Sequence, residues 1–384
     1  MKLTRFLVWL VVACLMLGAC DRDDGVVDSA AATAGPGNGL IAYSHDGDIY
    51  VGDPSARTSA AIVSGPESDI NPKFSPDGGR IAFVRGVPFE GPASLIVVKS
   101  DGSDEHVVVP EGFSGHGLDI GPFAWTPDGS SIVAQIDFPP ITYPHGDGEI
   151  GLFDPAGVRE PVLLTPPLHQ AIGAIYFNPS AQVAPMFRPP DGDLILSAGI
   201  LEMFNSDLTP VSQSLAEALA GYEAYGFAGN PTWSPDGANF VVEFADDMVV
   251  MDAEGGDPHN LGPGSEPTWS PDSSSVASAD FGRGERLQVD EVRIAVHDLA
   301  SGTKRILEST VTQVKRGAAV QTITNNTMHT WYHEGWSWSP DGRSLLLLKD
   351  HRTRPVVVDG ATDTATELPW ETDSFPSWQR KVAP

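Results

Sequence analysis

Trp233-Ser234-Pro235-Asp236-Gly237 is the stretch that decides the fold, because close variants of it recur along the chain. The other copies begin at Phe74, Trp125, Trp269 and Trp338, and a degraded copy, Phe187-Arg188-Pro189-Pro190-Asp191-Gly192, lies between the second and the third. Similar phrases at intervals of roughly 35–70 residues are typical of an array of similar supersecondary units. The sequence therefore predicts a repeat protein.

Each copy predicts a β-hairpin. Pro presets φ at the second turn position, Asp accepts hydrogen bonds from nearby backbone N–H groups, and Gly takes the positive φ that the turn needs. The apolar runs that follow, such as Ile81–Val84 and Leu345–Leu348, are rich in strand-forming residues. A second turn follows, as at Asp252-Ala253-Glu254-Gly255. One unit therefore has about four antiparallel strands, which is a propeller blade.

The two ends of the chain predict how the array closes. Residues Leu40–Val51 form a blade that lacks its first strand, and Phe375–Trp378 matches the start of the other blades and then stops. Pairing of these N- and C-terminal segments would complete a ring. The predicted fold is all-β, a single closed β-propeller of four-stranded blades. Six internal copies and the composite blade give seven blades; six is the alternative, because the copy at Phe187 is degraded.

The repeat resembles the TolB-like, WD40-like Pro-Asp propeller repeat over roughly Gly39 to Gln379. This resemblance implies the fold but no single function, since such repeats occur in periplasmic scaffolds, peptidase propellers and lyases. We expect the turn aspartates to stabilise the hairpins; they are Asp77, Asp128, Asp191, Asp236, Asp272 and Asp341. We expect the repeat aromatics to pack in the core between blades; they are Phe74, Trp125, Trp233, Trp269, Trp338 and Trp378.

The N-terminus indicates export. Lys2 and Arg5 precede an apolar segment, Phe6–Leu17, that is too short for an ordinary spanning helix. Leu17-Gly18-Ala19-Cys20 resembles a bacterial lipobox, which implies cleavage before Cys20 and a lipid on its sulfur. The alternatives are an ordinary secretory signal and an uncleaved anchor helix.

These features divide the chain into three parts. Residues 1–19 are the predicted lipoprotein signal peptide, 20–38 the lipidated cysteine with a flexible tether, and 39–384 the propeller. The predicted location is the bacterial cell envelope, exported from the cytoplasm and lipid-anchored to a membrane. Cys14 and Cys20 are the only cysteines, so the mature protein has neither a disulfide nor a catalytic thiol.

The charge balance restricts the partners. The chain has 23 basic and 51 acidic residues, a net charge of −28. Such a surface repels phosphate backbones, which excludes nucleic acid as a partner. Part of the acidic surplus consists of the turn aspartates of the repeat, and the remainder suits either a basic partner or a saline habitat.

Searches for catalytic motifs are mostly negative. The chain contains no Gly-x-Ser-x-Gly elbow, Walker loop or His-Glu-x-x-His sequence. Asp46-Gly47-Asp48 offers oxygens that suit calcium but is more typical of a turn. We therefore expect no cofactor, apart from the possibility of a divalent metal in the region described next.

One insertion carries metal-ligating residues. His329, His333 and Glu334 precede the copy at Trp338, and imidazoles with a carboxylate can hold a divalent metal. The arrangement loosely resembles the histidine-bearing propeller of oligogalacturonate lyases. The alternative is that these are ordinary loop residues. Three aromatics outside the repeat register are candidates for a binding contact; they are Trp331, Tyr332 and Trp336.

The sequence favours an envelope lipoprotein that acts as a non-catalytic propeller platform for protein or peptide binding. Its expected partner is an envelope protein or peptide, and the expected state is a monomer. One alternative is a metal-assisted polysaccharide lyase or hydrolase with its site at the ring mouth, around His329, His333 and Glu334. Another is a small-ligand-binding or sensor lipoprotein.

Overall fold

A computed structural model describes twelve segments of the chain. They are residues 37–86, 93–113, 120–136, 149–163, 186–187, 194–197, 201–204, 228–244, 247–280, 291–313, 336–348 and 354–381. All the regular elements in these segments are β-strands. The signal peptide, most of the tether and Ser212–Ala220, where the sequence favours a short helix, lie outside the described residues.

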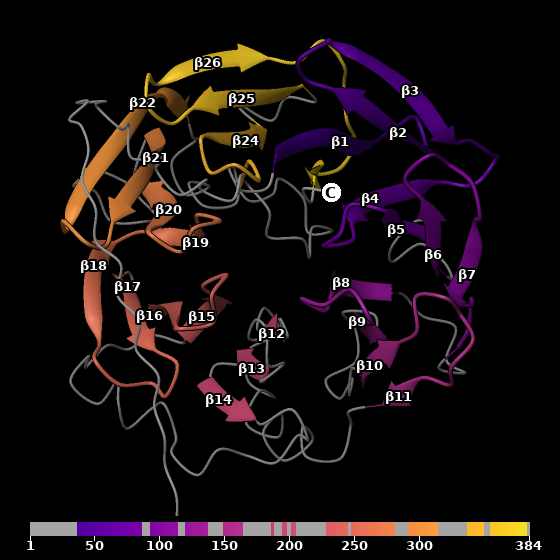
Figure 1. Ribbon diagram of the computed structural model, residues 1–384, viewed down its shortest axis with the longest axis horizontal. Helices are drawn as coiled ribbons and strands as arrows, with labels where there is room; N and C mark the ends of the chain where they lie inside the picture. The colour runs from indigo at the N-terminus through magenta and orange to yellow at the C-terminus, as the bar shows by residue number, and fades with distance from the viewer. Residues whose placement is uncertain are drawn as a thin grey trace, which may run out of the picture. The chain divides into compact units, whose positions relative to one another are not determined.

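The strands form seven antiparallel sheets (Figure 1). Three of them contain the first half of the chain and its C-terminus. The first sheet has the order β27 (Ser377–Lys381), β1 (Gly37–His45), β2 (Asp48–Asp53), β3 (Thr58–Val63). The second has β4 (Asp69–Phe74), β5 (Arg80–Arg85), β6 (Ser94–Lys99), β7 (His106–Val109). The third has β8 (Ile120–Trp125), β9 (Ile132–Ile136), β10 (Glu149–Phe153), β11 (Val162–Leu163).

The other four sheets follow in chain order. The fourth has three described strands, β12 (Met186–Phe187), β13 (Leu194–Ser197) and β14 (Leu201–Phe204). The fifth has β15 (Ala228–Trp233), β16 (Asn239–Phe244), β17 (Asp247–Asp252), β18 (His259–Pro263). The sixth has β19 (Ser265–Trp269), β20 (Ser275–Asp280), β21 (Glu291–Asp298), β22 (Thr303–Gln313). The seventh has β23 (Trp336–Trp338), β24 (Ser344–Leu348), β25 (Pro355–Asp359), β26 (Thr364–Glu367).

These sheets confirm the predicted all-β propeller with four-stranded antiparallel blades. The apolar runs Ile81–Val84 and Leu345–Leu348 lie within β5 and β24. The number of blades and the closure of the ring stay predictions. The pairing on which closure depends is present in the first sheet, where Ile41 lies opposite Trp378. Gly37 already pairs with Lys381, so β1 begins two residues before the predicted start of the propeller at residue 39.

The repeat phrase forms the turn between the first two strands of a blade. In the copy at Trp233, Gly237 has a φ of 70° and its N–H donates to Ser234 O over 2.8 Å. Asp236 Oδ1 accepts hydrogen bonds from Ser234 Oγ at 2.6 Å and from Ala238 N at 3.0 Å. In the copy at Trp269, Ser273 adopts a φ of 60° in place of glycine. The Asp bonds therefore organise the turn even where glycine is missing.

The hydrophobic core lies between neighbouring sheets. One cluster joins Ala277 and Ile294 of the sixth sheet to Leu345 and Val358 of the seventh. Another joins Ile41 and Tyr43 of the first sheet to Leu346 and Trp370, from the seventh blade and the segment after it. Further clusters join the first sheet to the second, the second to the third and the fifth to the sixth, and such packing between neighbouring sheets holds the blades of a radial array together.

Within the described segments, no helix is long and apolar enough to cross a bilayer.

Candidate functional site

Most of the residues singled out for metal or ligand binding lie outside the described residues; they are His329, Trp331, Tyr332, His333 and Glu334. The predicted lipidation site, Cys20, and the turn aspartate Asp191 also lie outside them. Trp336 is described, and only 3% of it is exposed. It packs in the core with Leu345 and Val356. Trp336 is therefore a core residue in this structure, unavailable as an exposed binding aromatic.

The described turn aspartates are engaged within their own hairpins. Hydrogen bonds from Ser75 and from the Gly79 backbone hold the pKa of Asp77 below its usual value. Thr126 and Ser130 have the same effect on Asp128. These carboxylates are ionised turn stabilisers. The same holds for the turn aspartates of the three later copies, Asp236, Asp272 and Asp341. Partial burial raises the pKa of each of them, but hydrogen bonds outweigh it and the pKa is lowered.

The repeat tryptophans connect neighbouring sheets. The indole Nε1 of Trp125 donates to Lys73 O at 3.0 Å, and that of Trp269 donates to Thr232 O at 2.9 Å. Each acceptor precedes the aromatic of the previous copy. Trp233 and Phe74 are buried, whereas Trp338 and Trp378 are partly buried. These aromatics lie in contacts between blades, which leaves the loops and the outer strands as places for binding.

The two ends of each described sheet differ. The repeat turns join the first strand of a blade to the second at one end, and we call the opposite end the insert end. Because the strands are antiparallel, the chain leaves the second strand, enters the third and leaves the fourth at the insert end. Loops on a rigid scaffold often carry binding residues.

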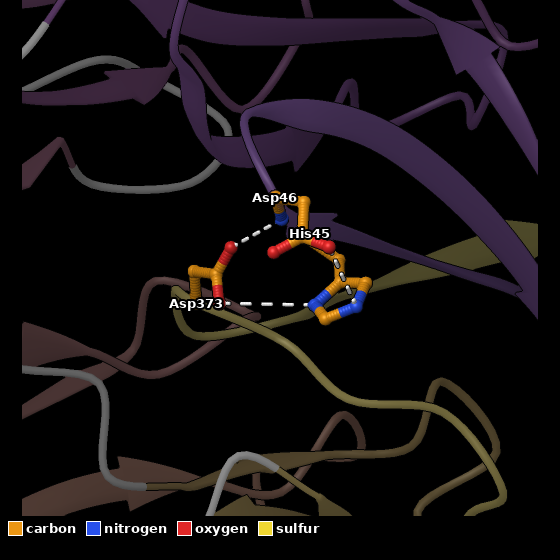
Figure 2. Close-up of side chains that lie close together, drawn as sticks. All are labelled: His45, Asp46 and Asp373. Atoms are coloured by element: carbon orange, nitrogen blue, oxygen red, sulfur yellow. Dashed lines mark hydrogen bonds and ion pairs between the residues drawn. The ribbon is translucent and has the colours of Figure 1, made fainter.

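A histidine with two carboxylates lies at the insert end. His45 is the last residue of β1, Asp46 begins the turn to β2, and Asp373 lies in the segment between β26 and β27. Figure 2 shows both carboxylates converging on the imidazole. His45 Nε2 is 3.5 Å from Asp46 Oδ2, and Nδ1 is 3.8 Å from Asp373 Oδ1. One ligand atom from each residue lies within 4.8 Å of the others.

Backbone contacts position this cluster. Asp373 N donates to Ser44 O at 2.8 Å, and Asp46 N donates to Asp373 Oδ2 at 2.6 Å. The His45 ring lies beside Tyr50, with 6.3 Å between the ring centroids. His45 Nδ1 is buried and has no hydrogen-bond partner among the described residues. The sequence favours a turn at Asp46 and singles out neither His45 nor Asp373, because nothing local links Asp46 to a residue 327 positions away.

The second candidate is an apolar surface on the second and third blades, which we call the apolar rim. It consists of Val107, Phe113, Val158 and Val162, which are 51%, 38%, 82% and 58% exposed. These are the exposed large apolar residues found in the described part of the chain. Val107 lies on β7 and Val162 on β11, the strands of their sheets farthest from β4 and β8 (Figure 1).

Contacts between the two blades hold the rim together. His106 Nε2 is 2.7 Å from Pro155 O, which joins β7 to the turn before β11. At Gly157, a Cβ would lie 3.2 Å from Val107 O, so this turn packs closely on β7. Phe113 packs edge-on against Phe153, with 5.7 Å between the ring centroids. These contacts place Val107 beside the turn that carries Val158, while Phe113 and Val162 belong to the same two blades.

Comparisons with known proteins concern the fold. No protein-family model and no curated protein matches the chain. A functionally unknown protein from Desulfotomaculum acetoxidans DSM 771 is 11% identical with a TM-score of 0.55, and the match covers 89% of this chain and 98% of that one. A chain of a mitotic checkpoint complex is 13% identical with a TM-score of 0.51, covering 81% and 84%. TolB from Acinetobacter baumannii is 16% identical with a TM-score of 0.48, covering 88% and 81%.

In fold, the chain is a TolB-like, WD40-like β-propeller. The repeat phrase and the four-stranded sheets carry this assignment. Because all three identities are low, the likenesses say nothing of a shared ligand or activity.

Proposed function

We propose that this protein is an exported envelope lipoprotein whose propeller is a non-catalytic platform for a protein or peptide partner. The observation that carries the proposal is the apolar rim. Single exposed apolar residues are ordinary, but a group of them on one surface is typical of an interaction site. The turn that carries Val158 lies against the backbone of Val107, so these two exposed valines stand on adjoining segments of neighbouring blades.

The surroundings of the rim indicate the chemistry of the partner. Exposed acidic residues flank β7 and β11; they are Asp101, Asp104, Glu105, Glu111 and Glu160. The whole chain carries a net charge of −28. Charge complementarity favours a partner that presents an apolar patch bordered by Lys or Arg. The apolar contacts would supply affinity, and the acidic border would speed association and exclude acidic proteins.

The predicted anchor supports the location. A lipid on Cys20 would hold the chain at a membrane, and the tether that follows it has an r.m.s. reach on the order of 25 Å. The propeller could then meet partners in the envelope near the membrane surface. The lyase alternative depends on His329, His333 and Glu334, which lie outside the described part of the chain, and the apolar rim favours a protein partner over a small ligand, so the platform is the function that we advance.

Co-purification from the native envelope tests the platform. The tagged full chain is compared with a Val158→Ser/Val162→Ser variant, in which two exposed apolar contacts are lost and no charge is added. Ala60→Ser/Ala61→Ser, at two exposed positions of the outer strand β3 of the first sheet, is the matched control. We expect wild type and control to retain a stoichiometric partner, and the rim variant to retain at least about tenfold less. Equal retention by all three proteins would contradict binding through the rim.

A further inference from the structure

The cluster of His45, Asp46 and Asp373 provides the donor atoms of a small metal site. The imidazole supplies one nitrogen and the two carboxylates supply oxygens. His45 Nδ1 is the available nitrogen, because it is buried, faces Asp373 Oδ1 at 3.8 Å and has no hydrogen-bond partner in the described residues. A separation of 3.8 Å is too long for a hydrogen bond. It leaves space for an ion between the two atoms.

We propose that these three residues bind one divalent transition-metal ion, with Zn²⁺ as the preferred ion. Two ligands of a tetrahedral zinc ion, each at about 2.0–2.1 Å, lie about 3.3 Å apart. The ligand atoms here lie within 4.8 Å of one another, so closure needs a movement of up to about 1.5 Å. Asp46 Oδ2 now lies 3.5 Å from Nε2 and must move toward Nδ1; a rotamer change can supply this movement, since 87% of the Asp46 side chain is exposed.

The donor set determines the class of ion. One imidazole and two carboxylates, with water in the remaining position, suit Zn²⁺, and at lower affinity Co²⁺ and Mn²⁺. Ca²⁺ prefers six to eight oxygen ligands, which this cluster does not offer. The expected order of affinity is therefore Zn²⁺, then Co²⁺, then Mn²⁺, with Ca²⁺ last.

The site would join two distant parts of the chain. Asp373 leads into β27, the strand that pairs with β1, and His45 ends β1. The ion would therefore fasten the segment that enters β27 to the strand on which β27 lies. Asp373 is already held by the Ser44 carbonyl and the Asp46 amide, so binding would order little additional backbone. Metal bound only by the folded chain raises its stability.

Metal titration of the purified full chain tests this site. Isothermal titration with Zn²⁺ and absorption titration with Co²⁺ give the bound equivalents, and thermal unfolding with and without Zn²⁺ gives the change in Tm. His45→Phe removes the nitrogen ligand and places there the residue found at the equivalent position of β16, Phe244. Asp373→Asn keeps an acceptor for Asp46 N but removes the charge. His259→Gln removes an exposed histidine on β18 and is the matched control.

The expected result is that His45→Phe and Asp373→Asn each bind one equivalent fewer than wild type and lose the rise in Tm. His259→Gln should match wild type in both measurements. The number of metal ions bound by each variant is compared with the number bound by wild type. The test therefore holds even if other histidines of the chain also bind metal. Unchanged equivalents in folded Asp373→Asn, or equal losses in His259→Gln, would overturn the site.

Discussion

The indole Nε1 of Trp338 donates a hydrogen bond to the carbonyl oxygen of Thr268, 3.1 Å away and 70 residues earlier in the chain. Trp125 and Trp269 make the same bond to the residue before the previous copy's aromatic. The repeat phrase therefore carries a contact between blades as well as a turn. The side chain of Phe74 has no N–H group to donate. Its backbone N–H donates a hydrogen bond to Ser377 Oγ at 3.0 Å.

Replacing Trp338 by Phe should destabilise the fold by about 1–2 kcal/mol, because it removes this bond and leaves the Thr268 carbonyl without it. Trp378→Phe is the matched comparison. Trp378 is also partly buried, but its Nε1 is buried with no hydrogen-bond partner among the described residues. The second substitution should cost less than the first in denaturant unfolding. Equal costs would mean that the bond contributes nothing beyond indole packing.

His297 should make the stability depend on pH. Burial, with help from the nearby charge of Lys304, lowers its pKa from 6.5 to about 4. Between these values the unfolded chain binds a proton that the folded chain does not. The free energy of unfolding should therefore fall as the pH is lowered from 6.5 to 4, by up to about 3 kcal/mol, and this contribution is complete above pH 6.5.

Denaturant unfolding at several pH values separates His297 from the other titrating groups. His297→Gln cannot titrate but can still bond Ser278 Oγ, which is 3.2 Å from His297 Nε2. Its unfolding free energy should decline less than that of wild type in this window. The exposed-site variant His259→Gln should retain the full decline. Parallel profiles for wild type and His297→Gln would show that His297 is not the source.

Lipidation of Cys20 can be tested with the other cysteine as the control. Cells expressing Cys20→Ser or Cys14→Ser are labelled with a radioactive fatty acid and then fractionated. We expect wild type and Cys14→Ser to carry label in the membrane fraction, and Cys20→Ser to carry none, because the thiol that accepts the lipid is absent. Label on Cys20→Ser would contradict the proposed anchor.

The repeat phrase predicted the blades because its turn chemistry is local. Pro, Asp and Gly act within five residues, and the strands on either side follow from apolar runs. The pairing of β1 with β27 was also predictable, since Phe375–Trp378 copies the start of a blade. One prediction from the repeat was wrong. Trp336 lies outside the repeat register and was therefore expected to be an exposed binding aromatic, whereas its indole lies in the core.

The two candidate sites could not be predicted in the same way. His45 and Asp373 meet only because the ends of the chain share one sheet. The apolar rim depends on which valines of β7 and β11 face outward, and on the turn at Gly157 lying against β7. Valines in short strands have the same pattern whether they lie in a core or on a surface. Tertiary contacts, rather than local preference, create both sites.

Site-specific photo-crosslinking shows whether a partner binds through the apolar rim. A photoreactive residue replaces Val158 on the apolar rim or, as control, Ala60 on the exposed outer strand β3 of the first sheet. After irradiation of intact cells, we expect one dominant protein adduct from position 158, with a basic and apolar contact surface, and little from position 60. Absence of an adduct at 158, or the same adducts at both positions, would contradict a platform that binds through the rim.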